Sequence, residues 1–141
     1  MDNVRPIDLL KAAGITQLAC VNTDNAWTHS FKLEGGMSFG LELQFATDSG
    51  NPDVKVELEA GGTELSAAEE GLTNLNYTVP KALGGGTNND TLIDSGANTV
   101  LVRFYPLPPV VAPFQRLKLT GGGANQATTR LTRAIVHQIP N

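Results

Sequence analysis

The stretch that decides the fold is residues 37–58, which read MSFGLELQFA at 37–46, TDSGNP at 47–52 and DVKVEL at 53–58. In the first arm, large apolar residues occupy every second position from Met37 to Phe45, and Val54, Val56 and Leu58 do the same in the second arm. Alternation at a period of two is typical of a strand with one buried face, because successive side chains point to opposite sides. The residues between the arms are those that form turns. The pattern predicts an antiparallel hairpin that buries one face in a core.

The rest of the chain continues this pattern of short strands and turns. Fifteen Gly and eight Pro in 141 residues suit strands joined by turns better than a helical bundle. Further strand candidates lie at 17–21, 27–33, 76–80, 91–94, 99–105, 114–120 and 128–139. About eight short strands with closely spaced turns are typical of a sandwich or barrel. We therefore predict an all-β fold, an antiparallel β-sandwich that resembles a jelly roll.

The chain divides into an N-terminal segment, residues 1–16, and a sandwich domain, residues 17–141. The segment could form a short helix from Pro6 to Gly14, because Pro is favoured in the first turn of a helix and Gly at its end. It could instead be an extended arm that lies on a neighbouring subunit, since so short a helix is unstable unless it is packed. The sequence leaves both interpretations open.

The composition argues against several kinds of partner. A formal net charge of −4 disfavours nucleic acid, because phosphate binding needs a basic surface. No apolar run approaches the roughly 20 residues that span a bilayer, and no secretory signal opens the chain. We therefore expect neither a nucleic-acid partner nor a membrane partner, and we expect synthesis in a reducing cytoplasm.

Residues that could carry catalysis form no recognisable motif. His29 and His137 are the only histidines, and no Gly-x-Ser-x-Gly elbow accompanies them. The glycine triplets at 84–86 and 121–123 lack the Lys-Ser/Thr pair of a phosphate-binding loop. Cys20 is the only cysteine, which excludes an internal disulfide and a cysteine-based zinc site. We predict a protein that is not an enzyme and needs no cofactor.

One loop could bind a metal ion. Asp48, Asn51 and Asp53 place three oxygen donors between the arms of the predicted hairpin, and Ca²⁺ accepts such ligands from flexible loops. Asp and Asn are also the residues that turns prefer, and the spacing lacks the bidentate Glu of an EF-hand. We favour a turn over a metal site.

Aromatic residues suggest an alternative function. Trp27, Tyr77 and Tyr105 could form a platform for a carbohydrate, because some β-sandwiches are lectin domains. In the other interpretation, Trp27 packs in the core and the tyrosines lie at the margins of the sheets. We favour packing because the chain has so few of these residues, and we retain a carbohydrate-binding module as the alternative.

Arginines on predicted strands suggest contacts between subunits. Arg130 and Arg133 lie three residues apart on the last strand, so regular alternation places them on opposite faces. Arginine is favoured at interfaces, although solvent-exposed strand faces would explain the same residues. The candidate interface residues of the chain are Arg5, Pro6, Ile7, Leu9, Leu10, Arg130 and Arg133.

Two segments carry a resemblance to a known group of proteins. They read DSGNPDVKVELE at 48–59 and RLKLTG at 116–121, and TTRL follows at 128–131. In order and character these features resemble small virion proteins of tailed bacteriophages, among them capsid decoration (cement) proteins. The resemblance implies a β-sandwich that binds a capsid or tail lattice, often as a trimer, and stabilises it without chemistry.

The sequence thus predicts a non-enzymatic structural protein of a virion. We expect a homo-oligomer, a trimer by the resemblance, that binds and stabilises the lattice of a major capsid protein. Residues 1–16 would be a natural arm for reaching a neighbouring subunit. Under the alternative, a carbohydrate-binding module used for host adsorption, a glycan would replace the capsid as the partner.

Overall fold

A computed structural model describes residues 6–32, 37–48, 52–79, 91–95, 100–106, 112–123 and 126–140. Its elements in chain order are β1 (Ile7–Asp8), α1 (Leu9–Ala12), β2 (Leu18–Ala19), β3 (Asn25–Trp27), β4 (Phe31–Lys32), β5 (Met37–Ala46), β6 (Asp53–Gly61), β7 (Tyr77–Thr78), β8 (Thr91–Ser95), β9 (Val100–Pro106), β10 (Phe114–Gly121) and β11 (Arg130–Pro140). Within these ranges strands dominate, and α1 has four residues.

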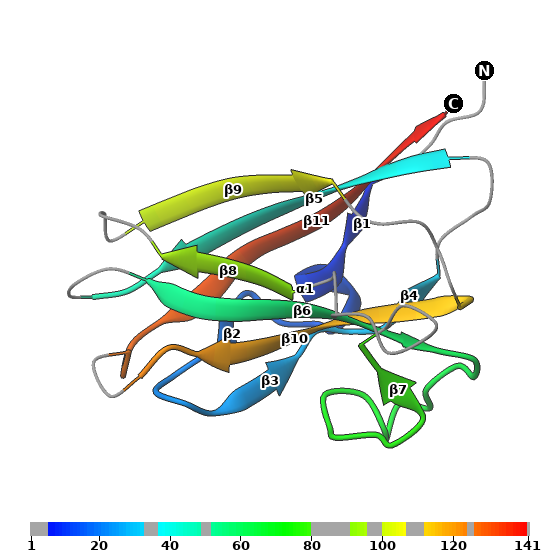
Figure 1. Ribbon diagram of the computed structural model, residues 1–141, viewed down its shortest axis with the longest axis horizontal. Coiled ribbons are helices and arrows are strands. Elements are labelled where there is room, and N and C mark those ends of the chain that lie inside the picture. Colours follow the sequence, from blue (N-terminus) through cyan, green and yellow to red (C-terminus); the bar gives the residue numbers. More distant parts are fainter. Residues whose placement is uncertain are drawn as a thin grey trace, which may run out of the picture.

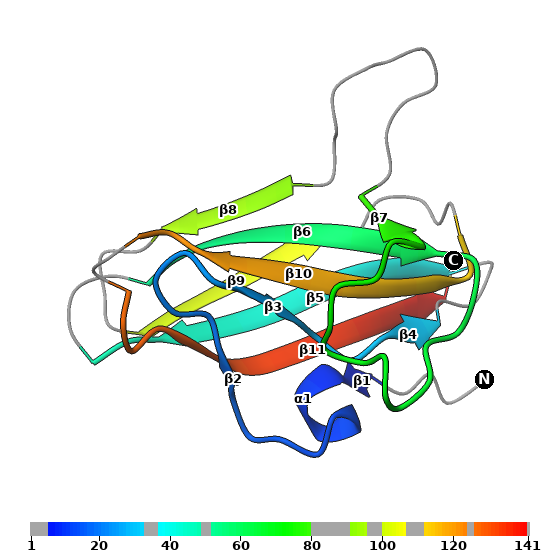
Figure 2. The ribbon, with the colours of Figure 1, turned by 90° about the horizontal axis from the view of Figure 1, so that it is seen from below.

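The strands form two antiparallel sheets that lie face to face (Figures 1 and 2). Sheet A has the order β1-β11-β5-β9, and β2 also pairs with β11. Sheet B has the order β3-β10-β6-β7, with β4 also on β10 and β8 also on β6. The predicted all-β sandwich is therefore confirmed.

The connectivity of the sandwich is that of a jelly roll. β1 and β2 both pair with β11, β3 and β4 both pair with β10, and β7 and β8 both pair with β6. When each of these couples is counted as one interrupted strand, the described strands number eight. If these eight strands are numbered 1 to 8 along the chain, the spatial order of the strands is 1-8-3-6 in sheet A and 2-7-4-5 in sheet B. Two Greek keys arranged in this way define a jelly roll.

The two strands of the predicted hairpin belong to different sheets. β5 pairs with β11 and β9, whereas β6 pairs with β10, β7 and β8. The predicted antiparallel hairpin is therefore wrong, although the alternate apolar side chains are buried as predicted from Phe39 to Phe45 and from Val54 to Leu58. Alternation specifies which face of a strand is buried but not which strand it bonds to, and here the chain leaves sheet A at Ala46 and enters sheet B at Asp53.

The core lies between the sheets and is built from alternate residues of the long strands. Its central members are Leu41, Leu43, Phe45, Val54, Val56, Leu117, Leu119, Leu131, Ala134 and Val136. In β10 the inward row also includes Gln115, whose Nε2 donates to Ala112 O at 2.6 Å. Phe114 therefore falls on the outer face of sheet B, and the register of β10 with β6 is continuous.

The helix α1 is shorter than the sequence suggests. It covers Leu9–Ala12, whereas the Pro and Gly signals predict residues 6–14. Asp8 caps its first turn by accepting hydrogen bonds from the backbone N–H groups of Leu10 at 3.1 Å and Lys11 at 3.0 Å. Pro6 precedes β1, which pairs with β11, so the helix begins only after this short strand.

The N-terminal residues fold onto their own chain. Leu9 and Leu10 are buried in the core, and Ile7 packs against it. Burial of these leucines stabilises a helical turn that would be unstable alone. Residues 7–10 therefore pack on their own chain, and a contact of residues 11–16 with a neighbouring subunit stays a prediction.

Candidate interaction surface

A β-bulge in β11 brings two arginines to the same side of sheet A. Arg130 stands opposite Ala46 in β5. The register then shifts at Thr132, so Arg133 stands opposite Gln44, which is two residues from Ala46 in β5. Opposed residues of paired strands share a face, and so do residues two apart in one strand. The predicted placement of Arg130 and Arg133 on opposite faces is wrong, because the extra residue of the bulge changes their parity.

Glu42 holds Arg133 and His137 on this outer face. Its Oε2 accepts a hydrogen bond from Arg133 Nε at 2.6 Å, and its Oε1 lies 2.8 Å from His137 Nε2. These contacts keep the pKa of the Glu42 carboxyl below its usual value, the hydrogen bond with His137 most and the one with Arg133 next. The carboxylate stays charged at neutral pH, so it orients the half-exposed guanidinium of Arg133.

Arg130 is held at the neighbouring end of the same face. Its Nη1 donates to Asp48 Oδ1 at 3.1 Å and to Thr128 O at 2.9 Å. Asp48 N donates in turn to Thr128 Oγ1 at 2.9 Å, which joins the turn before β11 to the end of β5. We name the surface formed by Glu42, Asp48, Arg130, Arg133 and His137 the arginine face.

Two hollows open beside the arginine face. The first, which we name the helix hollow, has a volume of about 570 Å³ and is lined by residues that include Lys11, Ile15 and Arg133. The second has a volume of about 450 Å³ and is lined by residues that include Thr128 and Arg130. A partner surface that entered either hollow would meet a guanidinium that is already oriented.

The N-terminal candidates for an interface have different positions in the structure. Leu9 is wrong as a contact with a partner, because it is fully buried in the core of its own chain, whereas Leu10 packs in that core and also lines the helix hollow. Pro6 is exposed and Ile7 is half-buried. Arg5 lies outside the described residues.

The predicted metal loop is only partly described. The Asp48 carboxylate pairs with Arg130, and Asp53 starts β6 with its backbone N–H donating to Gln126 Oε1 at 3.0 Å. Asn51 lies outside the described residues. Among the side chains that the structure describes, no group of three or more His, Cys, Asp or Glu is placed to hold a metal ion.

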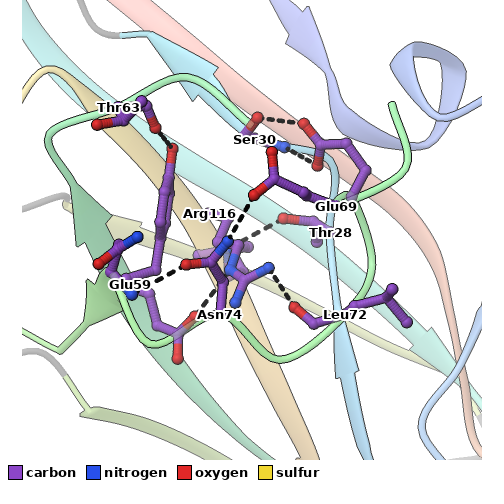
Figure 3. A network of polar contacts seen from close by, with 12 residues as sticks. Thr28, Ser30, Glu59, Thr63, Glu69, Leu72, Asn74 and Arg116 are labelled. Atoms are coloured by element: carbon purple, nitrogen blue, oxygen red, sulfur yellow. Dashed lines mark hydrogen bonds and ion pairs between the residues drawn. The ribbon is translucent and has the colours of Figure 1, made fainter. Parts of the chain in front are cut away.

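A third arginine, Arg116, is buried on the outer side of sheet B (Figure 3). Its Nε donates to Glu59 Oε1 at 2.8 Å, and its Nη1 donates to Leu72 O at 2.7 Å. Its guanidinium lies 5.2 Å from the centre of the Trp27 ring and 5.1 Å from that of Tyr77. The ion pair and the cation–π contacts offset the cost of burying the charge. A charge within an apolar strand is the signal in the sequence, but its partners come from distant segments.

Residues 62–76, which we name the cover loop, close over this cluster. Glu70 ties the loop to the sheet, because its carboxylate accepts hydrogen bonds from Ser30 N at 3.0 Å and from Ser30 Oγ. Tyr77 Oη donates to Thr63 O at 2.7 Å, near the start of the loop. Together with the bond from Arg116 to the Leu72 carbonyl, these contacts fix the loop at several points along its length.

His29 lies beside the hydrogen bonds between Glu70 and Ser30 but does not form a nucleophile–base pair with Ser30. Its Nδ1 lies 2.8 Å from Ser30 O, and its Nε2 lies 3.8 Å from Glu70 Oε1. Ser30 Oγ donates to Glu70 instead of an imidazole. A general base must reach the proton of the hydroxyl that it activates, so these three residues connect the loop to the sheet.

The described aromatic residues do not form the platform of the alternative function. Tyr77 is buried, and Trp27 is half-buried with its ring against Arg116. The side chain of Tyr105 lies outside the described part of the structure. Trp27 and Tyr77 therefore pack within the protein, in the Arg116 cluster and not in the core between the sheets.

Comparison of the chain with protein-family models finds no match, and neither does comparison with curated protein sequences. The described residues contain no helical segment with the length and hydrophobicity of a membrane-spanning helix.

Proposed function

We propose that this chain is a non-enzymatic structural protein of a virion. It is made in the host cytoplasm, assembles with itself as a trimer, and binds and stabilises the lattice of a major capsid protein. It needs no cofactor for this role. The arginine face supports a protein partner, and the resemblance of residues 48–59 and 116–121 supports a capsid as that partner.

The observation that carries the proposal is the shared placement of Arg130 and Arg133. The bulge puts both side chains on one face, and Asp48 and Glu42 hold the two guanidinium groups in place. Arginine is enriched at protein interfaces and in their hot spots. A side chain that is already oriented loses less conformational freedom on binding, so this face suits a rigid protein partner.

The sandwich gives the arginine face a rigid base. Jelly rolls occur in viral capsid domains and in lectin domains, so the strand order by itself selects neither function. The Trp27 and Tyr77 rings, on which a glycan would stack, pack around Arg116 instead. This difference favours a protein partner over a carbohydrate.

The test is to produce the protein together with the major capsid protein of the same genome and to purify the particles on a density gradient. We expect the protein to migrate with the particles at a fixed ratio and to raise the temperature at which they lose integrity. The double variant Arg130→Ala with Arg133→Ala should fold but bind the particles at least about tenfold more weakly. Lys55→Ala is the matched control, because Lys55 also pairs with an acid, Glu57, at 3.6 Å but lies in sheet B.

Three results would contradict this proposal. Wild-type protein that never migrates with the particles would refute the capsid role. Undiminished binding by the double arginine variant would refute the arginine face as the contact surface. Equal losses in the Lys55→Ala control and the double variant would show a general effect of surface charge, which would also refute that surface.

A further inference from the structure

The cover loop presents two apolar side chains to solvent. Leu75 is 97% exposed and Leu72 is 58% exposed. The backbone beneath them is fixed by Arg116, which donates to Leu72 O, and by Glu70, which accepts from Ser30. Single exposed apolar residues are common in soluble proteins. A fixed loop that exposes two of them, however, loses little freedom when a partner covers it, which is a property of a docking element.

The cover loop is also acidic. It contains Glu64, Glu69 and Glu70 and no Lys or Arg. Glu69 accepts a hydrogen bond from Ser66 N, and Glu70 is tied to the sheet. Glu64 is exposed, and none of the described residues forms an ion pair or hydrogen bond with it. Among the described residues no cation or hydrogen-bond donor meets Glu64, so the loop offers this carboxylate in addition to its exposed leucines.

The helix hollow has complementary properties. Ile15 lines it as an exposed apolar residue, and Lys11 contributes a cation, whereas the Arg133 guanidinium in its wall is already paired with Glu42. The carboxylate of Asp8 in its wall is engaged in capping α1, and within the described chain Lys11 has no ion pair. Its volume of about 570 Å³ exceeds the roughly 150 Å³ that accommodates a benzene-sized group. The hollow can therefore accept a leucine side chain next to a cation.

We propose that a second copy of this chain inserts Leu75 of its cover loop into the helix hollow and places its Glu64 beside Lys11. An acidic loop with an apolar tip thereby meets an apolar wall next to the Lys11 ammonium group. The loop lies on sheet B next to β7 (Figure 2). The hollow is lined by residues of α1 and of sheet A, among them Lys11, Gln44 and Arg133. Each copy therefore offers its loop to one neighbour and its hollow to another.

Such a head-to-tail contact closes into a ring when the rotation between copies divides a full turn, and it otherwise grows into a filament. Closure after three copies produces the trimer of the proposed function, on whose self-assembly this inference rests. The contact also explains why the cover loop is fixed in place while its leucines point to solvent.

Sedimentation velocity over a range of concentrations tests this contact. Leu75→Asp and Ile15→Asp should each raise the dissociation constant at least about tenfold, because each places a charge in the apolar part of the contact. Ile139→Asp is the matched control, since Ile139 is 57% exposed and lies about 20 Å along β11 from Arg133. The control should keep the wild-type mass, and the melting temperatures of all three variants should stay close to that of the wild type.

Mixing the two defective variants tests whether the loop of one copy meets the hollow of another. Leu75→Asp protein has an intact hollow, and Ile15→Asp protein has an intact loop. In the mixture, the intact loop of an Ile15→Asp copy can enter the intact hollow of a Leu75→Asp copy. The remaining loop and the remaining hollow of this pair are defective, so the mixture should yield a dimer that neither variant forms alone. A mixture that stays monomeric would contradict the head-to-tail arrangement.

Charge exchange tests the polar part of the contact. Lys11→Glu and Glu64→Lys should each weaken the assembly several-fold, because each places like charges opposite one another. The double variant restores an opposite pair and should regain most of the wild-type affinity. A double variant that is weaker than both single variants would contradict the pairing of Lys11 with Glu64.

Other outcomes would overturn this inference as a whole. A wild type that is monomeric at every concentration would do so, and so would Leu75→Asp protein with the wild-type mass. Leu75→Asp protein that stays oligomeric but loses the capsid particles would assign the loop to the capsid protein instead. Because particle binding is measured separately, a monomer that still binds particles would overturn this contact and leave the capsid role standing.

Discussion

Two arginine–glutamate pairs lie on the two outer faces of the same sandwich and have different consequences. Arg116 donates to Glu59 at 2.8 Å, and Arg133 donates to Glu42 at 2.6 Å, so the two pairs are chemically alike. The side chain of Arg116 is fully buried, whereas 51% of the Arg133 side chain is exposed. The surroundings of the pair therefore decide whether an arginine supports the fold or remains available to a partner.

The buried pair has neighbours that the exposed pair lacks. The rings of Trp27 and Tyr77 flank Arg116, and Leu72 O accepts one of its hydrogen bonds. An ion left unpaired in the protein interior costs several kcal/mol, whereas water solvates an ion at the surface. Breaking the two pairs should therefore have unequal effects.

The largest effect on stability is expected from Arg116→Met. Glu59 would be left buried without a cation, and the cover loop would lose its bond at Leu72. The free energy of unfolding should fall by about 3–5 kcal/mol, as measured by urea unfolding followed through tryptophan fluorescence. A loss of less than about 1 kcal/mol would contradict the importance of the buried pair.

The double variant Arg116→Met with Glu59→Met is the control for this measurement. It removes both charges, and apolar residues of similar size can replace a buried ion pair with little loss. It should therefore recover most of the stability that the single variant loses. A double variant as unstable as the single one would show that lost packing, and not the unpaired Glu59, is the cause.

A smaller loss is expected from Gly61→Ala. A Cβ at this position would lie 2.3 Å from Cε1 of Tyr77, so the ring would have to move away from Arg116. The expected cost is about 1–3 kcal/mol in thermal unfolding. Gly40→Ala is the matched control in β5, where a Cβ would meet nothing within 4 Å, and it should be neutral or slightly stabilising. Equal losses at both positions would contradict the stated role of Tyr77.

Arg133→Ala should reduce the free energy of unfolding by no more than about 1 kcal/mol. Its side chain is half-exposed, so water can solvate Glu42 in its absence. The same urea measurement applied to Arg133→Ala and Arg116→Met sharpens the comparison of the two faces. A loss above about 2 kcal/mol in Arg133→Ala would mean that the arginine face is part of the stabilising framework.

The smallest expected effect concerns pH. The contacts with His137 and Arg133 lower the pKa of Glu42 in the folded protein from the ordinary 4.5. The unfolded chain then binds more protons than the folded one, so the stabilisation is present above pH 4.5 and is lost as the pH falls through the folded pKa. In Arg133→Ala the pKa should move back toward 4.5, as an NMR titration of the Glu42 carboxyl carbon would show. An unchanged pKa would exclude Arg133 as a cause.

The sequence predicted the faces of the strands better than their neighbours. In β5 and β6 the alternating apolar residues are the buried ones, because parity along a strand is a local property. The pairing of these strands was wrongly predicted, because turn residues at 47–52 are compatible with a return to the same sheet and with a crossing to the other. Which of these occurs depends on β10 and β11, the strands much later in the chain that pair with β6 and β5.

The candidate site was predictable only in part. Arg130 and Arg133 stand out in the sequence as charges on a strand, but their common face depends on the bulge at Thr132. A bulge is a mismatch between two paired strands, so its position is not contained in either strand alone. The Arg116 cluster was not predicted, because its partners lie in β3, β6, β7 and the cover loop.

By itself, the sequence determined the all-β class, the approximate positions of the long strands and the side of each that is buried. These properties follow from the alternation of neighbouring residues and from local turn chemistry. Only the tertiary structure decided the separation of β5 from β6, the common face of Arg130 and Arg133, and the burial of Arg116. These properties arise from contacts between residues far apart in the chain, and the free energy of such contacts depends on how all the strands pack together.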